Sequence, residues 1–224
     1  MRSTKRIVGI ASVPQRKESL LTVVASIKDQ VDEIFIALNG YPSVPEELHE
    51  VRNAKYAIFD NSQMDLMKFY VAGDVDGYFF GLDDDLRVSE GYVDYLQRGV
   101  GAYHGVVSLH GRYYQPPVTH FKRWSRNYRC LNAVEHDAMV NFIGSGCCAF
   151  HTDSLKVDIR DFKYPGMADC YLSRLAFTQG VPMFVLKHRI GQYLEYIPPL
   201  KGTTLWETNK DYTHQTEILK SYLG

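Results

Sequence analysis

Short apolar runs alternate with segments of helical spacing along the first half of the chain. The runs cover residues 6–12, 33–38, 55–59, 77–82 and 106–110, and each is short enough for a buried strand. The segments between them cover residues 18–30, 45–51, 62–72 and 89–103 and are expected to form helices. Strands that alternate with helices predict an α/β fold, with a mostly parallel sheet between helical layers.

The second half of the chain has a less regular pattern. Residues 112–133 show no clear period and are expected to form a long excursion. Residues 138–150 are expected to form a β run around a central Gly-Ser-Gly, followed by a helix over 168–179, a strand over 182–187 and a helix over 212–222. This half predicts a small antiparallel extension of the sheet. The pattern does not divide the chain into two domains.

Polar or small residues stand at the end of each strand predicted in the first half. They are Ala11-Ser12, Asn39-Gly40, Asp60-Asn61, Asp83-Asp84-Asp85 and His110-Gly111. Ligands of open parallel sheets bind outside the carboxyl ends of the strands. The sequence therefore predicts a binding site along this edge.

Three consecutive aspartates, Asp83 to Asp85, follow the fourth predicted strand. Carboxylates within about 4 Å of one another repel by roughly 1 kcal/mol even in water. A divalent cation removes this repulsion, and Mn²⁺ or Mg²⁺ prefers carboxylate and phosphate oxygens. The triplet predicts a metal that bridges a diphosphate. A solvated acidic loop or the start of the next helix is the alternative.

Composition and charge give no indication of a nucleic-acid-binding, membrane or secreted protein. The net charge is −1 and hydrophobic residues make up 45% of the chain, so no overall excess points to nucleic acid or a membrane. No apolar stretch reaches the about 18 residues of a membrane span, and the run at residues 7–13 is too short for a signal peptide. The four cysteines form no CxxC pair and fit reduced thiols. We expect a cytoplasmic protein.

Five segments together resemble GT-A glycosyltransferases, especially family 2 and its relatives. Residues 78–96 (YFFGLDDDLRVSEGYVDYL) resemble the DXD segment, and residues 8–27, 34–40, 60–70 and 167–182 match other segments in the same order. The resemblance covers roughly residues 6–190. Two departures are the Ala168-Asp169 pair where the family has Glu-Asp, and the absence of a QxxRW-like motif, which argues against a processive polysaccharide synthase.

The resemblance implies one GT-A domain over residues 1–224. It divides into a nucleotide-binding half (1–111), an acceptor and catalytic half (112–190) and a C-terminal tail (191–224). The implied reaction transfers a hexose or pentose from a nucleotide-sugar, in the first place a UDP-sugar, to an acceptor hydroxyl, with Mn²⁺ or Mg²⁺ as cofactor. The residues implied to bind the donor nucleotide are Ala11, Ser12, Arg16, Asn39, Asp65, Lys68, Asp83 and Asp84.

The resemblance also implies a metal site and a general base. Asp83 and Asp85 would bind the metal, and His188 is a third candidate ligand, although a structural role for this histidine stays open. Asp169 would take the proton of the acceptor hydroxyl, and a single base implies inversion at the anomeric carbon. An acid in the first turn of a helix is the alternative for Asp169.

Residues 112–129 contain basic and aromatic residues and no acid, which suits a phosphate-bearing or stacked acceptor. An ordinary surface loop is the alternative. The predicted acceptor residues are His110, Arg112, Arg123, Trp124, Arg126, Gly144, Ser145 and Gly146. Two acceptor classes stay open: a glycan or lipid-linked saccharide, and a hydroxymethylated base in DNA, as in the DNA-modifying glycosyltransferases of phages, which would require base flipping.

Other nucleotide-binding classes fit the sequence less well. An NAD-dependent oxidoreductase would carry GxGxxG after the first strand, where IASVPQR stands instead. A sugar nucleotidyltransferase would carry a glycine-rich, basic loop at the same place. That class and a non-catalytic nucleotide-sugar-binding domain remain the alternatives to a transferase.

Overall fold

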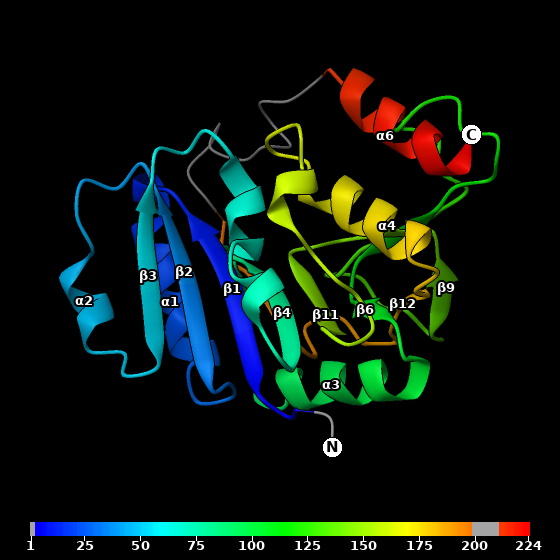
Figure 1. Ribbon diagram of the computed structural model, residues 1–224. Helices are drawn as coiled ribbons and strands as arrows, with labels where there is room; N and C mark the ends of the chain where they lie inside the picture. The colour runs from blue at the N-terminus through cyan, green and yellow to red at the C-terminus, as the bar shows by residue number, and fades with distance from the viewer. Residues whose placement is uncertain (1–2, 199–210) are drawn as a thin grey trace.

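The computed structural model describes residues 3–198 and 211–224 of the chain. Its centre is an eight-stranded sheet in the order β3-β2-β1-β4-β11-β6-β12-β9 (Figure 1). The strands are β1 Arg6–Ser12, β2 Glu33–Asn39, β3 Ala54–Phe59, β4 Tyr78–Asp83, β6 Val106–Ser108, β9 Ala138–Val140, β11 Cys147–His151 and β12 Met183–Val185.

Most neighbouring strands of this sheet are parallel. Strand β1 pairs in parallel with β2 and β4, β2 with β3, and β6 with β12. Strand β11 runs antiparallel to both β4 and β6, and β9 runs antiparallel to β12. The predicted α/β fold with a mostly parallel sheet is therefore confirmed.

Helices cover both faces of the sheet because successive residues of a strand point to opposite faces. Val8 and Phe80 pack in one core with α1 (Lys17–Ile27) and α3 (Tyr92–Tyr103). Ile7 and Phe79 pack in the opposite core with α4 (Ala168–Thr178) and α6 (Thr213–Leu223). A short helix, α2 (Glu46–His49), lies between β2 and β3 in the sequence, and the 3-10 turn η1 (Pro14–Arg16) precedes α1.

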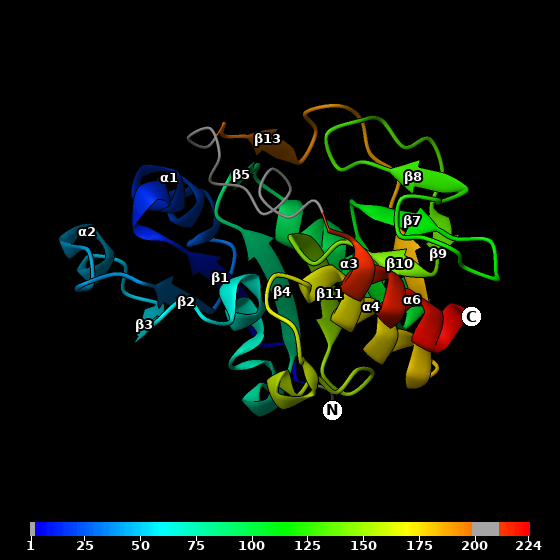
Figure 2. The same cartoon turned by 90° about the horizontal axis from the view of Figure 1, so that it is seen from above.

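Two small antiparallel sheets confirm the predicted extension. One has the order β10-β7-β8, with β7 Gly111–Tyr113, β8 Arg126–Tyr128 and β10 Phe142–Ile143. The other pairs β5 (Leu86–Val88), directly after the acidic turn, with β13 (Leu194–Tyr196). Figure 2 shows β7 and β8 beside the end of the main sheet that carries β9.

The segment at residues 62–72 differs from its prediction as an α-helix. It forms two 3-10 turns, η2 (Met64–Phe69) and η3 (Ala72–Asp74). Ser62 does not cap η2; its backbone N–H donates instead to Asp60, and Asn61 and Met64 have positive φ angles of 66° and 51°. Turn η2 packs directly on β1, where a Cβ added to Gly9 would lie 2.0 Å from the carbonyl oxygen of Lys68.

The expected β run at residues 138–150 is interrupted twice. It forms β9, β10 and β11, separated at Asn141 and at Gly144 to Gly146. A fourth 3-10 turn, η4 (Ile159–Asp161), precedes α4. No helix within residues 3–198 or 211–224 has the length and apolar character needed to cross a bilayer, and the four cysteines have free thiols.

Candidate functional site

The carboxyl ends of three adjacent parallel strands bring the predicted donor residues together. Ala11 of β1 lies beside Ala37 of β2 on one side and beside Asp83 of β4 on the other. Asn39 ends β2, so its side chain reaches the same edge. The parallel pairing itself therefore places these residues in one site.

A cavity of about 350 Å³ opens at this edge. Its size is that of a small-molecule site. The lining residues are Ala11, Ser12, Val13, Gln15, Arg16, Asn39, Asn61, Met64, Asp65 and Asp84. Six of them were predicted from the sequence, namely Ala11, Ser12, Arg16, Asn39, Asp65 and Asp84.

Buried polar atoms without a partner mark the cavity as a site for a polar ligand. They are Arg16 Nε, Asn39 Oδ1, Asp65 Oδ1 and Asp84 Oδ2, none of which has a hydrogen-bond partner among the described residues. A buried polar atom without a partner costs about 1–3 kcal/mol. All four belong to residues that line the cavity, so one bound molecule with several donors and acceptors could satisfy them together.

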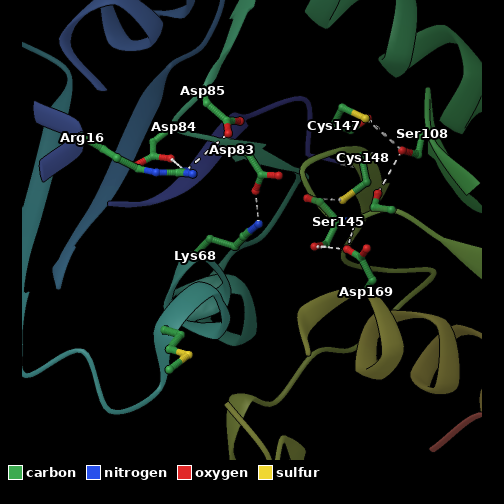
Figure 3. A network of polar contacts seen from close by, with 12 residues as sticks. Arg16, Lys68, Asp83, Asp84, Asp85, Ser108, Ser145, Cys147, Cys148 and Asp169 are labelled. Atoms are coloured by element: carbon green, nitrogen blue, oxygen red, sulfur yellow. Dashed lines mark hydrogen bonds and ion pairs between the residues drawn. The ribbon is translucent and has the colours of Figure 1, made fainter. Parts of the chain in front are cut away.

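Two cations, the half-buried Arg16 and the buried Lys68, hold the acidic turn (Figure 3). Nη1 of Arg16 donates to Oδ1 of Asp84 at 2.5 Å and lies 3.4 Å from Oδ2 of Asp85. The ammonium group of Lys68, whose side chain is 2% exposed, forms an ion pair with Asp83. Lys68 thus contacts the carboxylate of Asp83 and is not among the residues that line the cavity, and its role in donor binding stays a prediction.

The site carries more negative than positive charge. Burial, followed by the charge of Asp83, raises the pKa of Asp85 to about 7. Burial also raises the pKa of Asp65 to about 7, against the lowering effect of Lys68. Burial alone would lower the pKa of Lys68, but the surrounding carboxylates outweigh it and raise the pKa. The raised pKa values of Asp85 and Asp65 thus arise first from burial, and the neighbouring carboxylates add to the effect.

The aspartates fit a metal that also binds a phosphate-bearing ligand. Among the described residues, no group of three or more His, Cys, Asp or Glu side chains is arranged to hold a metal ion alone. Mg²⁺ in nucleotide sites commonly uses only one or two carboxylates, together with phosphate oxygens and water. Asp83 and Asp85 supply two carboxylates close enough to raise the pKa of Asp85.

His188 lies just beyond β12 and is buried. Its Nδ1–H donates to the carbonyl oxygen of Leu186 at 2.8 Å, and its backbone pairs with Val134. Within the described residues it shares no contact with Asp83 or Asp85. Its role as a metal ligand stays a prediction that these contacts do not support.

Asp169 lies in the first turn of α4 and is half-buried. The backbone N–H and the hydroxyl of Ser145 both donate to its Oδ1, at 2.7 and 2.6 Å. Among the described residues, Oδ2 of Asp169 receives no hydrogen bond. Figure 3 shows Asp169 and Ser145 across from the Lys68–Asp83 pair, so the candidate base and the acidic turn face the same region.

The predicted acceptor residues are more dispersed. Arg112 is buried, with its guanidinium 4.7 Å from the ring centre of Trp124 and 4.9 Å from that of Phe121. Arg123 and Arg126 are exposed. The ring of His110 packs against Gly144, and its carbonyl oxygen accepts from the backbone N–H of that glycine at 2.9 Å. The structure places Ser145 beside Asp169 but not the three arginines.

Four residues that line the cavity were not predicted to bind the donor. Val13, Gln15, Asn61 and Met64 belong to the loops after β1 and β3. Asn61 follows directly after a predicted strand end, so its position alone could have identified it. Met64 could not be found in this way, because it reaches the cavity through a 3-10 turn that the sequence predicted as an α-helix.

Comparison with known proteins supports the fold alone. No family model matches the chain, and no curated protein matches it. Among 99 matching chains of solved structures is S. aureus TarS (residues 1–349), with a TM-score of 0.55 and 11% identity over 87% of this chain. The chain spans 60% of the length of that TarS chain. The likeness shows that this chain shares the fold of that TarS structure, a mixed α/β fold with a mostly parallel sheet flanked by helices.

Proposed function

We propose that the protein is a metal-dependent glycosyltransferase that moves a sugar from a nucleotide-sugar to an acceptor hydroxyl. One observation carries the proposal. The cavity at the ends of β1 and β2 has four buried polar atoms without a partner, and the acidic turn and its two cations adjoin it. The glycosyltransferase-like fold supports this interpretation.

The donor nucleotide would occupy the cavity. Asn39 and Asp65 offer buried acceptor atoms to the N–H and O–H groups of a base and ribose, and Arg16 offers a buried donor. A nucleotide without a donor group opposite Asn39 or Asp65 would leave a buried acceptor atom without a hydrogen bond, which costs binding free energy. These two residues would therefore discriminate between nucleotides. We propose a UDP-sugar as the donor.

The diphosphate would lie at the acidic turn. Asp83 and Asp85 would hold Mn²⁺ or Mg²⁺, which when bound supplies positive charge to the departing nucleoside diphosphate. Arg16 holds Asp84 and lies near Asp85, and Lys68 holds Asp83, so the carboxylates keep their orientation before the donor arrives. Such preorganisation is the main source of electrostatic catalysis.

Asp169 would act as the general base. Ser145 fixes Oδ1 through two hydrogen bonds, which leaves Oδ2 to accept the proton of the acceptor hydroxyl. The acceptor oxygen would attack the anomeric carbon on the face opposite the nucleotide. A single displacement of this kind inverts the configuration.

For the acceptor, we propose a glycan or lipid-linked saccharide that carries a phosphate. Arg123 and Arg126 are exposed and Trp124 is half-buried, so this segment offers charge and an aromatic face together. The same features favour a hydroxymethylated base in DNA as the second candidate.

A thermal-shift and donor-hydrolysis screen tests the proposal. The protein is incubated with UDP, GDP, CMP or NAD, each with and without Mn²⁺, and then with the corresponding nucleotide sugars. We expect stabilisation that needs both Mn²⁺ and one nucleotide, and slow hydrolysis of the matching donor. The Asp85→Ala variant should lose the stabilisation by nucleotide that depends on Mn²⁺. Stabilisation by NAD, or by no nucleotide at all, would overturn the proposed function.

A further inference from the structure

The tripeptide Gly144-Ser145-Gly146 joins β10 to β11 and lies between the two halves of the proposed site. The sequence predicted it as part of the acceptor surface. Ser145 is instead 1% exposed, and its hydroxyl is already bound to Asp169. The tripeptide therefore contacts the catalytic groups themselves.

On one side, the tripeptide holds the candidate base. Both the backbone N–H and the hydroxyl of Ser145 donate to the same oxygen of Asp169. Two donors on one oxygen fix the plane of the carboxylate and select which oxygen stays available. Hydrogen bonds to an ionised acceptor are roughly twice as strong as bonds between neutral groups.

On the other side, Gly146 contacts Asp83, the aspartate proposed to bind the metal. The backbone N–H of Asp83 donates to the carbonyl oxygen of Gly146 at 2.9 Å. The Cα of Gly146 lies directly against the carboxylate, because an added Cβ would lie 1.9 Å from Oδ2 of Asp83. Only glycine leaves room for the carboxylate in this orientation.

The tripeptide is itself fixed at its other contacts. The hydroxyl of Ser108 donates to the carbonyl oxygen of Gly144 at 2.9 Å, and the N–H of Gly144 donates to the carbonyl oxygen of His110. The carbonyl oxygen of Ser145 packs on Gly81, where an added Cβ would lie 2.4 Å away. The tripeptide is thus tied to β4 and to the end of β6 as well as to α4.

We propose that Gly144-Ser145-Gly146 sets the spacing between the general base and the metal-binding carboxylate, with Ser145 and Gly146 as positioning residues for the transfer step. The inference rests on the proposed function and adds to it. Asp83 belongs to β4 and Asp169 to α4, two elements far apart in the sequence, yet the consecutive residues Ser145 and Gly146 contact them. A displacement of about 1 Å between reacting groups can cost 10²-fold in rate.

Two single substitutions separate the two contacts. Ser145→Ala removes the hydroxyl bond to Asp169 and keeps the contact of Gly146 with Asp83. We expect kcat for transfer to fall by about 10- to 100-fold, while the donor KM and the Mn²⁺ affinity stay within about two-fold. Gly146→Ala displaces the carboxylate of Asp83, and we expect the Mn²⁺ affinity in the presence of UDP to fall at least about ten-fold.

The measurements are Mn²⁺ binding by electron paramagnetic resonance with UDP present, and steady-state kinetics with the donor found in the screen. Gly101→Ala is the matched control, because an added Cβ there meets no atom within 4 Å. Ser145→Thr restores the hydroxyl and should recover part of kcat. If Gly146→Ala does not fold, the Ser145→Ala and Ser145→Thr pair still decides the base contact.

The possible outcomes distinguish a failure of the proposed function from a failure of the positioning role alone. A wild-type protein that neither binds Mn²⁺ with UDP nor hydrolyses a nucleotide sugar overturns the proposed function and the inference together. An active wild type whose Ser145→Ala variant keeps its kcat overturns the inference alone. So does a Ser145→Ala variant that loses kcat and Mn²⁺ affinity in equal measure, since a merely structural role would move both.

Discussion

The carboxyl-end edge of the sheet and the basic segment at residues 112–129 carry similar polar residue types, but these residues have different surroundings in the structure. At the carboxyl-end edge, Arg16 and Asn39 line one cavity, and each has a buried polar atom without a hydrogen-bond partner among the described residues. In the basic segment, Arg112 is buried among aromatic rings, and Arg123 and Arg126 are exposed. Backbone pairing fixes the position of a polar residue at the end of a parallel strand. A polar residue in a long loop lacks this constraint.

The largest expected effect concerns Asp169. In the proposed function, this residue acts between the nucleotide bound at the strand ends and the acceptor bound at residues 112–129. We expect Asp169→Asn to lower kcat for transfer by about 10²- to 10⁴-fold, because the amide cannot take the proton. Binding of UDP with Mn²⁺ should be unchanged, since the cavity and the acidic turn are untouched. Kinetics and isothermal titration measure the two quantities. Asp161→Asn, at an exposed acid, is the control, and near wild-type turnover in Asp169→Asn would remove the base assignment.

Arg112 tests whether the basic segment contributes to packing. Arg112→Ala removes a guanidinium that lies within 5.2 Å of the ring centres of Phe121, Trp124 and Phe142. We expect a loss of about 2 kcal/mol in the free energy of unfolding, measured by denaturant titration. Arg129→Ala, at an exposed arginine of the same segment, should change it by less than about 0.5 kcal/mol. Equal losses of stability in the two variants would contradict a packing role for Arg112.

Arg123 and Arg126 test whether the same segment contacts the acceptor. Replacing both with Gln should raise the acceptor KM about ten-fold, because two charge-assisted contacts are lost, and should leave donor hydrolysis unchanged. The paired control replaces the exposed Lys28 and Arg52 with Gln, which alters the net charge equally. A rise in KM in both pairs would indicate general charge steering and not a local contact.

The smallest expected effect concerns Asp65, the acid that lines the cavity at the ends of β1 and β2. The pKa of Asp65 is raised by burial from 3.8 to about 7 in the folded protein. Between these values the folded state binds more protons at Asp65 than the unfolded state, so the contribution of Asp65 to the free energy of unfolding falls as the pH rises from about 4 to 7.

Replacing Asp65 with Asn removes this penalty. At pH 8 we expect the Asp65→Asn variant to be more stable by about 1 kcal/mol, which raises Tm by about 2–4 °C, and at pH 4 we expect no gain. Scanning calorimetry at the two pH values measures the difference. Asp29→Asn, at an exposed acid, should show no such dependence. A gain that is the same at both pH values would contradict the assignment of the raised pKa to Asp65.

The sequence predicted the alternating half of the fold well because its signals are local. The apolar run that became β1 kept its predicted bounds, and the strand ends placed Ser12, Asn39 and Asp83 along one edge. The segment at residues 62–72 was predicted wrongly as an α-helix, because its apolar spacing fits a 3-10 turn equally well. Packing of η2 on β1 decides between the two, and no local pattern contains that contact.

The long-range contacts of the site were beyond the sequence. Nothing near Ser145 indicates that it binds Asp169, because the pairing depends on how α4 docks on the sheet. The ion pair between Lys68 and Asp83 was likewise not predicted, because the two residues meet only when η2 packs beside β4. The residue types of the site were predictable, whereas their partners depend on the tertiary arrangement.

The position of β11 has a consequence for how this protein is made. This strand lies between β4 and β6, although both precede it in the chain. While the ribosome is still synthesising residues 112–146, one backbone edge of β4 has no neighbour, and unpaired strand edges promote association between chains. Folding of the first half is therefore completed only when residues 147–151 emerge, and a fragment that ends before them should depend on chaperones or aggregate.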